Sequence, residues 1–220
     1  MKRLYLRLRD RLASRPDTEH EQALIRLAVG ITLFFYLLPG AFIDTGKELE
    51  TDLLYLGAML AFLSLAAIIF VCIFFMPGVS PTRRILGAIL DSAAATFFMV
   101  VADFHAAPLF LVYFWITLAN GFRYGAPYLL ASLGFSLVGF SIVLTLGQFW
   151  HTHLTEGIGL LLGMAVLSLY ALTLVRRMWA AVARAEAANQ AKRRFVSVVS
   201  HEMRTPLKDR KSTRLNSSHT

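Results

Sequence analysis

Long apolar runs separated by short polar segments dominate the pattern of this chain. Six runs carry few charged residues, and they lie at about 27–43, 53–76, 85–101, 106–119, 126–146 and 156–175. A helix needs roughly 20 apolar residues to cross the hydrocarbon core of a bilayer. The second, fifth and sixth runs reach that length, the first and third are near its lower limit, and the fourth is the shortest. The pattern predicts an all-α membrane protein with about six transmembrane helices, which form a transmembrane bundle over 27–175.

Basic residues are unevenly distributed among the segments that connect these runs. Lys and Arg gather in four segments, 1–26, 77–84, 120–125 and 176–194. The remaining connections hold only Lys47 between them, and they are 44–52, 102–105 and 147–155. Because cytoplasmic segments of membrane proteins are enriched in Lys and Arg, the alternation predicts six spans with both termini in the cytoplasm.

Composition agrees with this picture. Hydrophobic residues make up 56% of the chain, above the about 45–50% that is usual in soluble domains. A net charge of +8 would suggest nucleic acid as a partner of a soluble protein, but here the positions of the basic residues follow membrane topology, and no nucleic-acid partner is expected. His151 and His153 lack a third ligand, so no metal site is expected.

Few polar residues interrupt the apolar runs. Asp91 is the one acid well inside a run, and an intramembrane carboxylate usually faces a bundle interior or a water-filled cavity. It is either a ligand or proton contact, or, if the third run starts later, a residue near the interface. Arg26 lies beside the first run, and we expect it to extend to the interface. Gly159 and Gly163 form a small-xxx-small pair that ordinary helix packing explains.

A helical segment follows the last run. From Val175 to Pro206 there is no intervening Gly or Pro, and Ala, Arg, Glu, Gln and Lys are frequent, all of them good helix formers. A heptad-like stripe is formed by Val175, Met178, Val182, Ala185 and Asn189. This pattern predicts a signalling helix at 176–194 that pairs with a second copy in a homodimer. The alternative is an amphipathic helix on the bilayer surface.

Residues 195–207 carry the chemistry. At about 100° per residue, His201 lies roughly 200° round a helix from Val199, which places it away from the apolar side and toward solvent. An exposed imidazole beside an acid, Glu202, is suited to nucleophilic attack on a phosphoryl group. Pro206 is expected to bend or end the helix just after this position.

The string Phe195-Val-Ser-Val-Val-Ser200-His201-Glu202-Met203-Arg204-Thr205-Pro206-Leu207 resembles the H-box of histidine kinases, Phe-x-x-x-x-Ser-His-Glu-x-Arg-Thr-Pro-Leu, at every fixed position. The resemblance implies an ATP-dependent protein-histidine kinase of a two-component phosphorelay. It implies that His201 is the phosphoacceptor, that Glu202 assists transfer as an acid or base, and that Thr205 supports phosphatase activity. The implied partners are a receiver domain or a response regulator.

A narrower resemblance starts with the segment from Arg15 to Arg26. This segment, the multi-span region and the H-box together resemble RpfC-like hybrid sensor histidine kinases, which sense diffusible signal factor, a cis-2-unsaturated fatty acid. The resemblance implies quorum sensing at a bacterial inner membrane, with Asp17, Glu19 and Gln22 in contact with the signal. A periplasmic N-terminus would require five spans, whereas the basic residues before residue 16 favour six.

The end of the chain and the alternative functions complete the sequence-based expectations. Residues 208–220 resemble a translated sequencing adapter, and we exclude them from the expected fold. ATP and Mg²⁺ would bind in a catalytic domain that is absent from this sequence, so this fragment alone is expected to be inactive. One alternative is a sensor kinase for a different membrane-read signal. The other is a six-span transporter or channel, which would bring polar residues of several helices together at midmembrane.

Overall fold

The computed structural model describes residues 19–43, 49–76 and 78–216, and the side chains of 19–38, 53–73, 75–76, 78–196 and 198–199. All regular elements in these ranges are helical. They are α2 (Glu19–Ile43), α3 (Leu49–Phe75), α4 (Pro81–Val101), the 3₁₀ helix η1 (Asp103–Leu109), α5 (Phe110–Tyr124), α6 (Ala126–Leu146), α7 (Gln148–Thr152) and α8 (Leu154–Asn216). The chain divides after Val175 into two units, which we call the membrane unit and the α8 extension.

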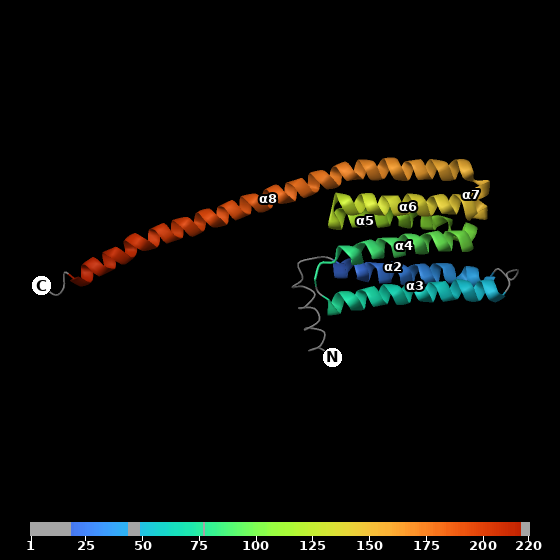
Figure 1. Ribbon diagram of the computed structural model, residues 1–220, viewed down its shortest axis with the longest axis horizontal. Helices are drawn as coiled ribbons and strands as arrows, with labels where there is room; N and C mark the ends of the chain where they lie inside the picture. The colour runs from blue at the N-terminus through green and yellow to red at the C-terminus, as the bar shows by residue number, and fades with distance from the viewer. Residues whose placement is uncertain (1–18, 44–48, 77, 217–220) are drawn as a thin grey trace. The chain divides into compact units, whose positions relative to one another are not determined.

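Six helices within the described residues are long and apolar enough to cross a membrane, as expected for a multi-pass membrane protein. They lie side by side in the membrane unit (Figure 1). Two boundaries differ from the expected ones. The first span begins at Glu19 rather than near residue 27, and the fourth extends over Asp103–Tyr124 because η1 adds a helical segment before α5. The predicted fold class and the number of spans are thus confirmed.

Local sequence signals explain several helix ends. Ser80 is the N-cap of α4, and its Oγ accepts a hydrogen bond from the backbone N of Arg83 at 3.3 Å. Pro81 follows at the first helical position, where its missing N–H has no consequence. Gly125 separates α5 from α6 with φ 93°, a backbone conformation that glycine adopts without steric penalty. These residues set the two turns at the basic end of the bundle.

The main core draws buried residues from every helix of the membrane unit and is densest in α4, η1, α5 and α6. Tyr113 and Phe140 are fully buried there. The Phe140 ring contacts Phe110 at 4.7 Å and Trp150 at 5.3 Å between ring centroids. A smaller cluster joins Leu129 of α6 to Ala171, Leu172 and Val175 of α8. Packing of this kind, rather than water exclusion, is the main force between helices in lipid.

Helix α8 is the longest element. It runs for 63 residues and continues past Pro206 to Asn216. Of the two outcomes expected at Pro206, a bend or an end of the helix, the end is therefore excluded. From Arg176 to Val196 the described side chains are all exposed. Over 176–196 the extension is therefore a single helix whose described side chains have no packed partner in their own unit.

Candidate functional site

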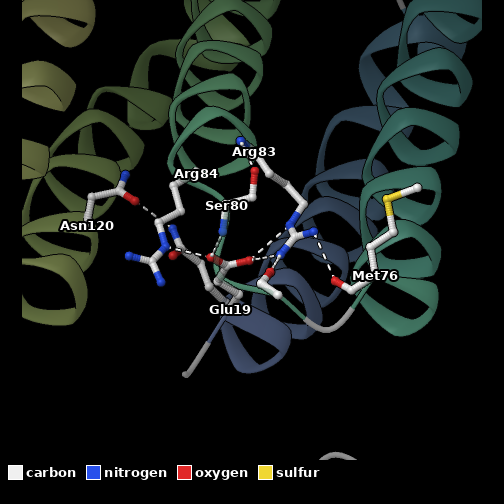
Figure 2. Close-up of polar contacts among 8 residues, drawn as sticks. Glu19, Met76, Ser80, Arg83, Arg84 and Asn120 are labelled. Carbon is white, nitrogen blue, oxygen red and sulfur yellow. Dashed lines mark hydrogen bonds and ion pairs between the residues drawn. The ribbon is translucent and has the colours of Figure 1, made fainter. Parts of the chain in front are cut away.

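A buried carboxylate joins the first turns of two helices at the basic end of the membrane unit. Glu19, at the start of α2, exposes 3% of its surface. Its oxygens accept hydrogen bonds from Arg83 Nε at 2.9 Å, Arg84 Nε at 2.6 Å and the backbone N of Ser80 at 3.3 Å, and Arg83 Nη2 makes a further ion pair with it. Figure 2 shows this cluster, in which a charge removed from water is matched by two opposite charges.

The two arginines extend these contacts to other helices. Arg83 also donates to the backbone oxygens of Gly78 at 2.8 Å and Met76 at 3.3 Å, just after α3. The guanidinium carbon of Arg84 lies 4.1 Å from the ring centroid of Tyr124 and 5.6 Å from that of Tyr128. Such stacking of a cation on aromatic faces is attractive. Glu19 is thereby connected to α3, α4 and the junction between α5 and α6.

One turn further along α2, an amide pair joins α2 to α5. Gln22 Nε2 donates to Asn120 Oδ1 at 2.8 Å, and Asn120 Nδ2 donates to the backbone oxygen of Ile116 at 2.8 Å. Gln22 Oε1 is buried and has no hydrogen-bond partner among the described residues. An acceptor left in this state favours any ligand that brings a donor.

An ion pair lies one turn deeper still. Arg26 Nε donates to Asp91 Oδ1 at 2.6 Å and Arg26 Nη2 to Asp91 Oδ2 at 2.9 Å. The two side chains are only 7% and 15% exposed. The expectation that Arg26 extends to the interface was therefore wrong, because a carboxylate on the neighbouring helix binds it inside the bundle. Asp91 is the middle residue of the 21-residue α4, so its placement near an interface is also excluded.

A pocket with a cavity volume of about 60 Å³ lies between α2, α3, α4 and α5. Its polar lining comes from Gln22, Arg26, Asp91 and Arg123. Its apolar lining includes Leu33, Phe34, Leu37, Met59, Phe98 and Leu109. A second pocket, with a cavity volume of about 10 Å³, is lined by Glu19 and shares Gln22 and Arg26 with the first. A long apolar cavity with polar groups at one end suits an amphipathic ligand.

The comparisons with known proteins found two curated relatives that carry the same name. Two curated proteins named "Sensory/regulatory protein RpfC", from two strains of Xanthomonas campestris pv. campestris, are each 38% identical to this chain over 202 residues. Over these residues the chain is a homologue of RpfC. The match covers 91% of this chain and 27% of each relative, so the chain spans about a quarter of the length of RpfC. No protein-family model and no solved structure matches the chain.

In this RpfC homologue, the residues expected to contact a signal do not all line the same pocket. Gln22 and Asp91 line the large pocket, and Glu19 lines the smaller one. Asp17 lies outside the described residues. The large pocket thus brings together Gln22, which the family resemblance indicated, and Asp91, which stood out as an intramembrane acid.

Sequence reasoning missed several of the site's residues. Arg83 and Arg84 had been interpreted only as markers of topology, and Asn120 had not been singled out. The sequence offered one signal for Asn120, a side-chain amide at the end of the short apolar run 106–119. Gly87 of α4 also belongs to this site, because its neighbour across the helix interface is the Arg26 guanidinium.

The H-box-like string at 195–207 lies on the last helix of this RpfC homologue. His201, Glu202 and Thr205 fall within the range of α8, and their side chains are outside the described ones. Helical backbone at these positions agrees with the expected helix. The assignment of His201 as phosphoacceptor stays a prediction.

Proposed function

We propose that the chain is the membrane sensor and phosphoacceptor portion of a sensor histidine kinase in a two-component phosphorelay at a bacterial inner membrane. The observation that carries this proposal is a complete H-box at 195–207, on the same helix as the last span, in a homologue of a sensory/regulatory protein. In this reaction a ring nitrogen of His201 attacks the γ-phosphorus of Mg²⁺-bound ATP and ADP leaves. Glu202 accepts the imidazole proton, and the phosphoryl group then passes to a receiver aspartate.

The exposed helix of the α8 extension supports a homodimer. Met178 and Val182 are 37% and 41% exposed on the stripe expected to pair. A solvent-exposed helix with an apolar stripe gains stability when a second copy covers that stripe. Dimerisation would also let the catalytic domain of one subunit reach the imidazole of its partner.

Labelling of His201 tests the kinase assignment. The chain is co-reconstituted in nanodiscs with full-length RpfC whose own phosphoacceptor histidine has been replaced, and γ-³²P-ATP is added. We expect acid-labile label on this chain, none on His201→Gln, and at least about tenfold slower labelling of Glu202→Gln. Thr205→Ala should label normally and lose label more slowly. Label that persists on His201→Gln would contradict the assignment.

We propose further that the signal is a cis-2-unsaturated fatty acid. The large pocket supports this because polar groups lie at one end of an apolar cavity. Saturable binding of the labelled acid to the reconstituted chain is the expected result, with weaker binding of the saturated acid of the same length. Without saturable binding, the kinase proposal stands and the signal is a different membrane-read one.

The transporter alternative has one observation in its favour. Gln22, Arg26, Asp91 and Asn120 converge inside the bundle, as a transport site would require. Homology to a sensory/regulatory protein favours a binding site without transport. We expect no flux of the fatty acid across sealed proteoliposomes beyond that of protein-free vesicles; sustained flux that Asp91→Asn abolishes would support the transporter.

A further inference from the structure

We propose that the pocket between α2, α3, α4 and α5 recognises the carboxyl head of its ligand in the neutral, protonated form. Gln22 accepts the acid O–H and Arg26 donates to the acid carbonyl. The inference rests on the proposed fatty-acid signal, and it assigns that signal a place and a head-group chemistry.

The orientation of Gln22 follows from its neighbour. Asn120 uses its Nδ2 to donate to the backbone oxygen of Ile116, so Asn120 turns its Oδ1 toward Gln22. That oxygen requires a donor, and Gln22 must therefore present Nε2 to it. Gln22 Oε1 is then a buried acceptor without a partner among the described residues. A ligand that satisfies it must carry a hydrogen-bond donor.

The donor for the other ligand atom comes from Arg26. Gln22 and Arg26 are four residues apart on α2, so they share one face of the helix, and both line the pocket. Asp91 occupies Nε and Nη2 of Arg26 and leaves the N–H groups of Nη1. A neutral carboxylic acid has one donor and one acceptor, which matches this pair of groups.

Charge favours the neutral form of the acid. Arg26 and Asp91 neutralise each other inside the bundle. A carboxylate anion would add a negative charge beside Asp91. The other cation that lines the pocket, Arg123, is already paired with Glu21, so both described cations of the lining have counter-ions and the buried anion would lack one of its own. Desolvation in a membrane also raises the pKa of the ligand's carboxyl group, so the protonated form is accessible there.

Gly87 holds the space in which Arg26 lies. A Cβ at this position would collide with Arg26 Nη2 and would lie 3.1 Å from its guanidinium carbon. Any larger residue must move the guanidinium from its present place. Gly87 is therefore a positioning residue for the head-group site, and its substitution by alanine is a small change that tests Arg26 without removing it.

The apolar part of the pocket accommodates a single chain. The α2 stripe that lines it runs from Gln22 to Leu37, a rise of about 22 Å at 1.5 Å per residue. Trp115 forms part of the wall and is 51% exposed. The pocket therefore borders the surface that faces lipid, from which an acyl chain can enter.

Head-group analogues test this proposal in the full chain reconstituted in nanodiscs. The probes are a cis-2-unsaturated fatty acid, its primary amide and its methyl ester. The amide keeps a donor and an acceptor, whereas the ester has no donor. We expect acid and amide to bind with similar affinity below the pKa of the bilayer-bound acid, and the ester at least about tenfold more weakly. Raising the pH should weaken binding of the acid and leave the amide unchanged.

Recognition of an anion would give a different result. If the acid binds more tightly as the pH rises and the amide binds poorly, or if the ester binds as tightly as the acid, the inference is overturned while the fatty-acid signal survives. If the wild-type chain binds none of the three probes, the fatty-acid signal fails as well. Labelling of His201 remains an independent measure of the kinase assignment.

Variants locate the head group. Gly87→Ala should lower the affinity for acid and amide at least about tenfold, whereas Gly57→Ala, a position with open space around it, should leave both unchanged. The double variant Arg26→Gln with Asp91→Asn removes both buried charges together and preserves neutrality, and it should lose the same affinity. Unchanged affinity in a folded Gly87→Ala or double variant would refute the placement.

Discussion

The two ends of the membrane unit are held together by different forces. At the basic end, where α2 and α4 begin, Glu19 binds two arginines and Arg84 stacks on Tyr124. At the opposite end, η1 and α7 meet through contacts between aromatic rings and through one hydrogen bond from the α7 backbone to a side chain of η1. Figure 1 shows the two ends on either side of the bundle.

The opposite end is mainly a packed aromatic cluster. Phe149 stacks on His153 with ring centroids 4.3 Å apart, and Trp150 is buried against Phe140. Asp103, with φ 50°, accepts a hydrogen bond at Oδ1 from the backbone N of Phe149 at 2.7 Å. The dispersion contacts between these rings are numerous, weak individually and insensitive to charge.

The difference indicates which end is suited to respond to a signal. Buried ionic and amide contacts have few discrete partners, so a ligand that adds a donor or acceptor can rearrange them. Val175, the last residue of the membrane unit, packs on Leu129 near Tyr128 and the Arg84 stack. The polar residues and the final membrane segment of α8 therefore share one end of the unit.

The largest effect should come from removing one charge of the deep ion pair. Asp91→Asn leaves Arg26 buried without its counter-ion, and we expect a loss of about 3–5 kcal/mol in the free energy of unfolding. Adding Arg26→Gln should recover much of this loss. SDS-induced unfolding of the two variants, followed by circular dichroism, checks the prediction. A double variant less stable than Asp91→Asn would contradict it.

A packing defect at the opposite end should separate stability from binding. Trp150→Ala removes a buried ring and should destabilise the chain by about 3 kcal/mol, with no change in fatty-acid affinity in the folded protein. Trp115→Ala should instead lower the fatty-acid affinity and leave the stability nearly unchanged, because Trp115 is half exposed and lines the pocket. Unfolding and binding measured on both variants decide whether the two ends are independent.

Neutralising the carboxylate at the basic end should have an intermediate effect. Glu19→Gln loses charge-assisted hydrogen bonds to two arginines, and we expect a loss of about 2 kcal/mol in stability. Glu21→Gln is the matched control, since Glu21 is 53% exposed and binds Arg123 at 3.0 Å. The Glu21→Gln variant should lose less than about 1 kcal/mol in the free energy of unfolding. Equal losses in the same unfolding assay would show that burial of Glu19 has no consequence.

The smallest effect should come from the cap of α4. Ser80→Ala removes the side-chain acceptor for the backbone N of Arg83, and we expect a loss of about 1 kcal/mol. Thr82→Ala, an exposed position in the same turn, should change stability little. A melting temperature that is equal in the two variants would mean that Glu19 alone organises this turn.

Sequence reasoning was most successful where a property is local. The apolar runs predicted six spans, and the described residues contain six helices of the required length and composition. The fourth run was predicted too short because His105 and Asp103 interrupt its hydropathy, whereas η1 keeps the backbone helical through them. Asp91 was recognised as an unusual intramembrane acid, yet its partner was not.

Contacts between distant segments were the part that sequence reasoning could not predict. Arg26 was expected at the interface because hydropathy considers each charge only with its neighbours in the chain. Glu19 and Gln22 came from a family resemblance, and the resemblance did not say that Arg84 or Asn120 would bind them. The H-box string could be identified from the sequence alone because all its fixed positions lie within 195–207.

The amino-acid sequence by itself determined the helical class, the number of spans, the basic end and the position of the H-box. These follow from sums over neighbouring residues, such as hydropathy, charge bias and helical spacing. The tertiary structure decided that Arg26 binds Asp91, 65 positions away, and that Gln22 Oε1 has no hydrogen-bond partner in the part of the chain that the structure describes. It also decided that these three residues line one pocket. An ion pair requires two side chains within a few ångströms, and only the packing of helices brings residues so distant in the chain together.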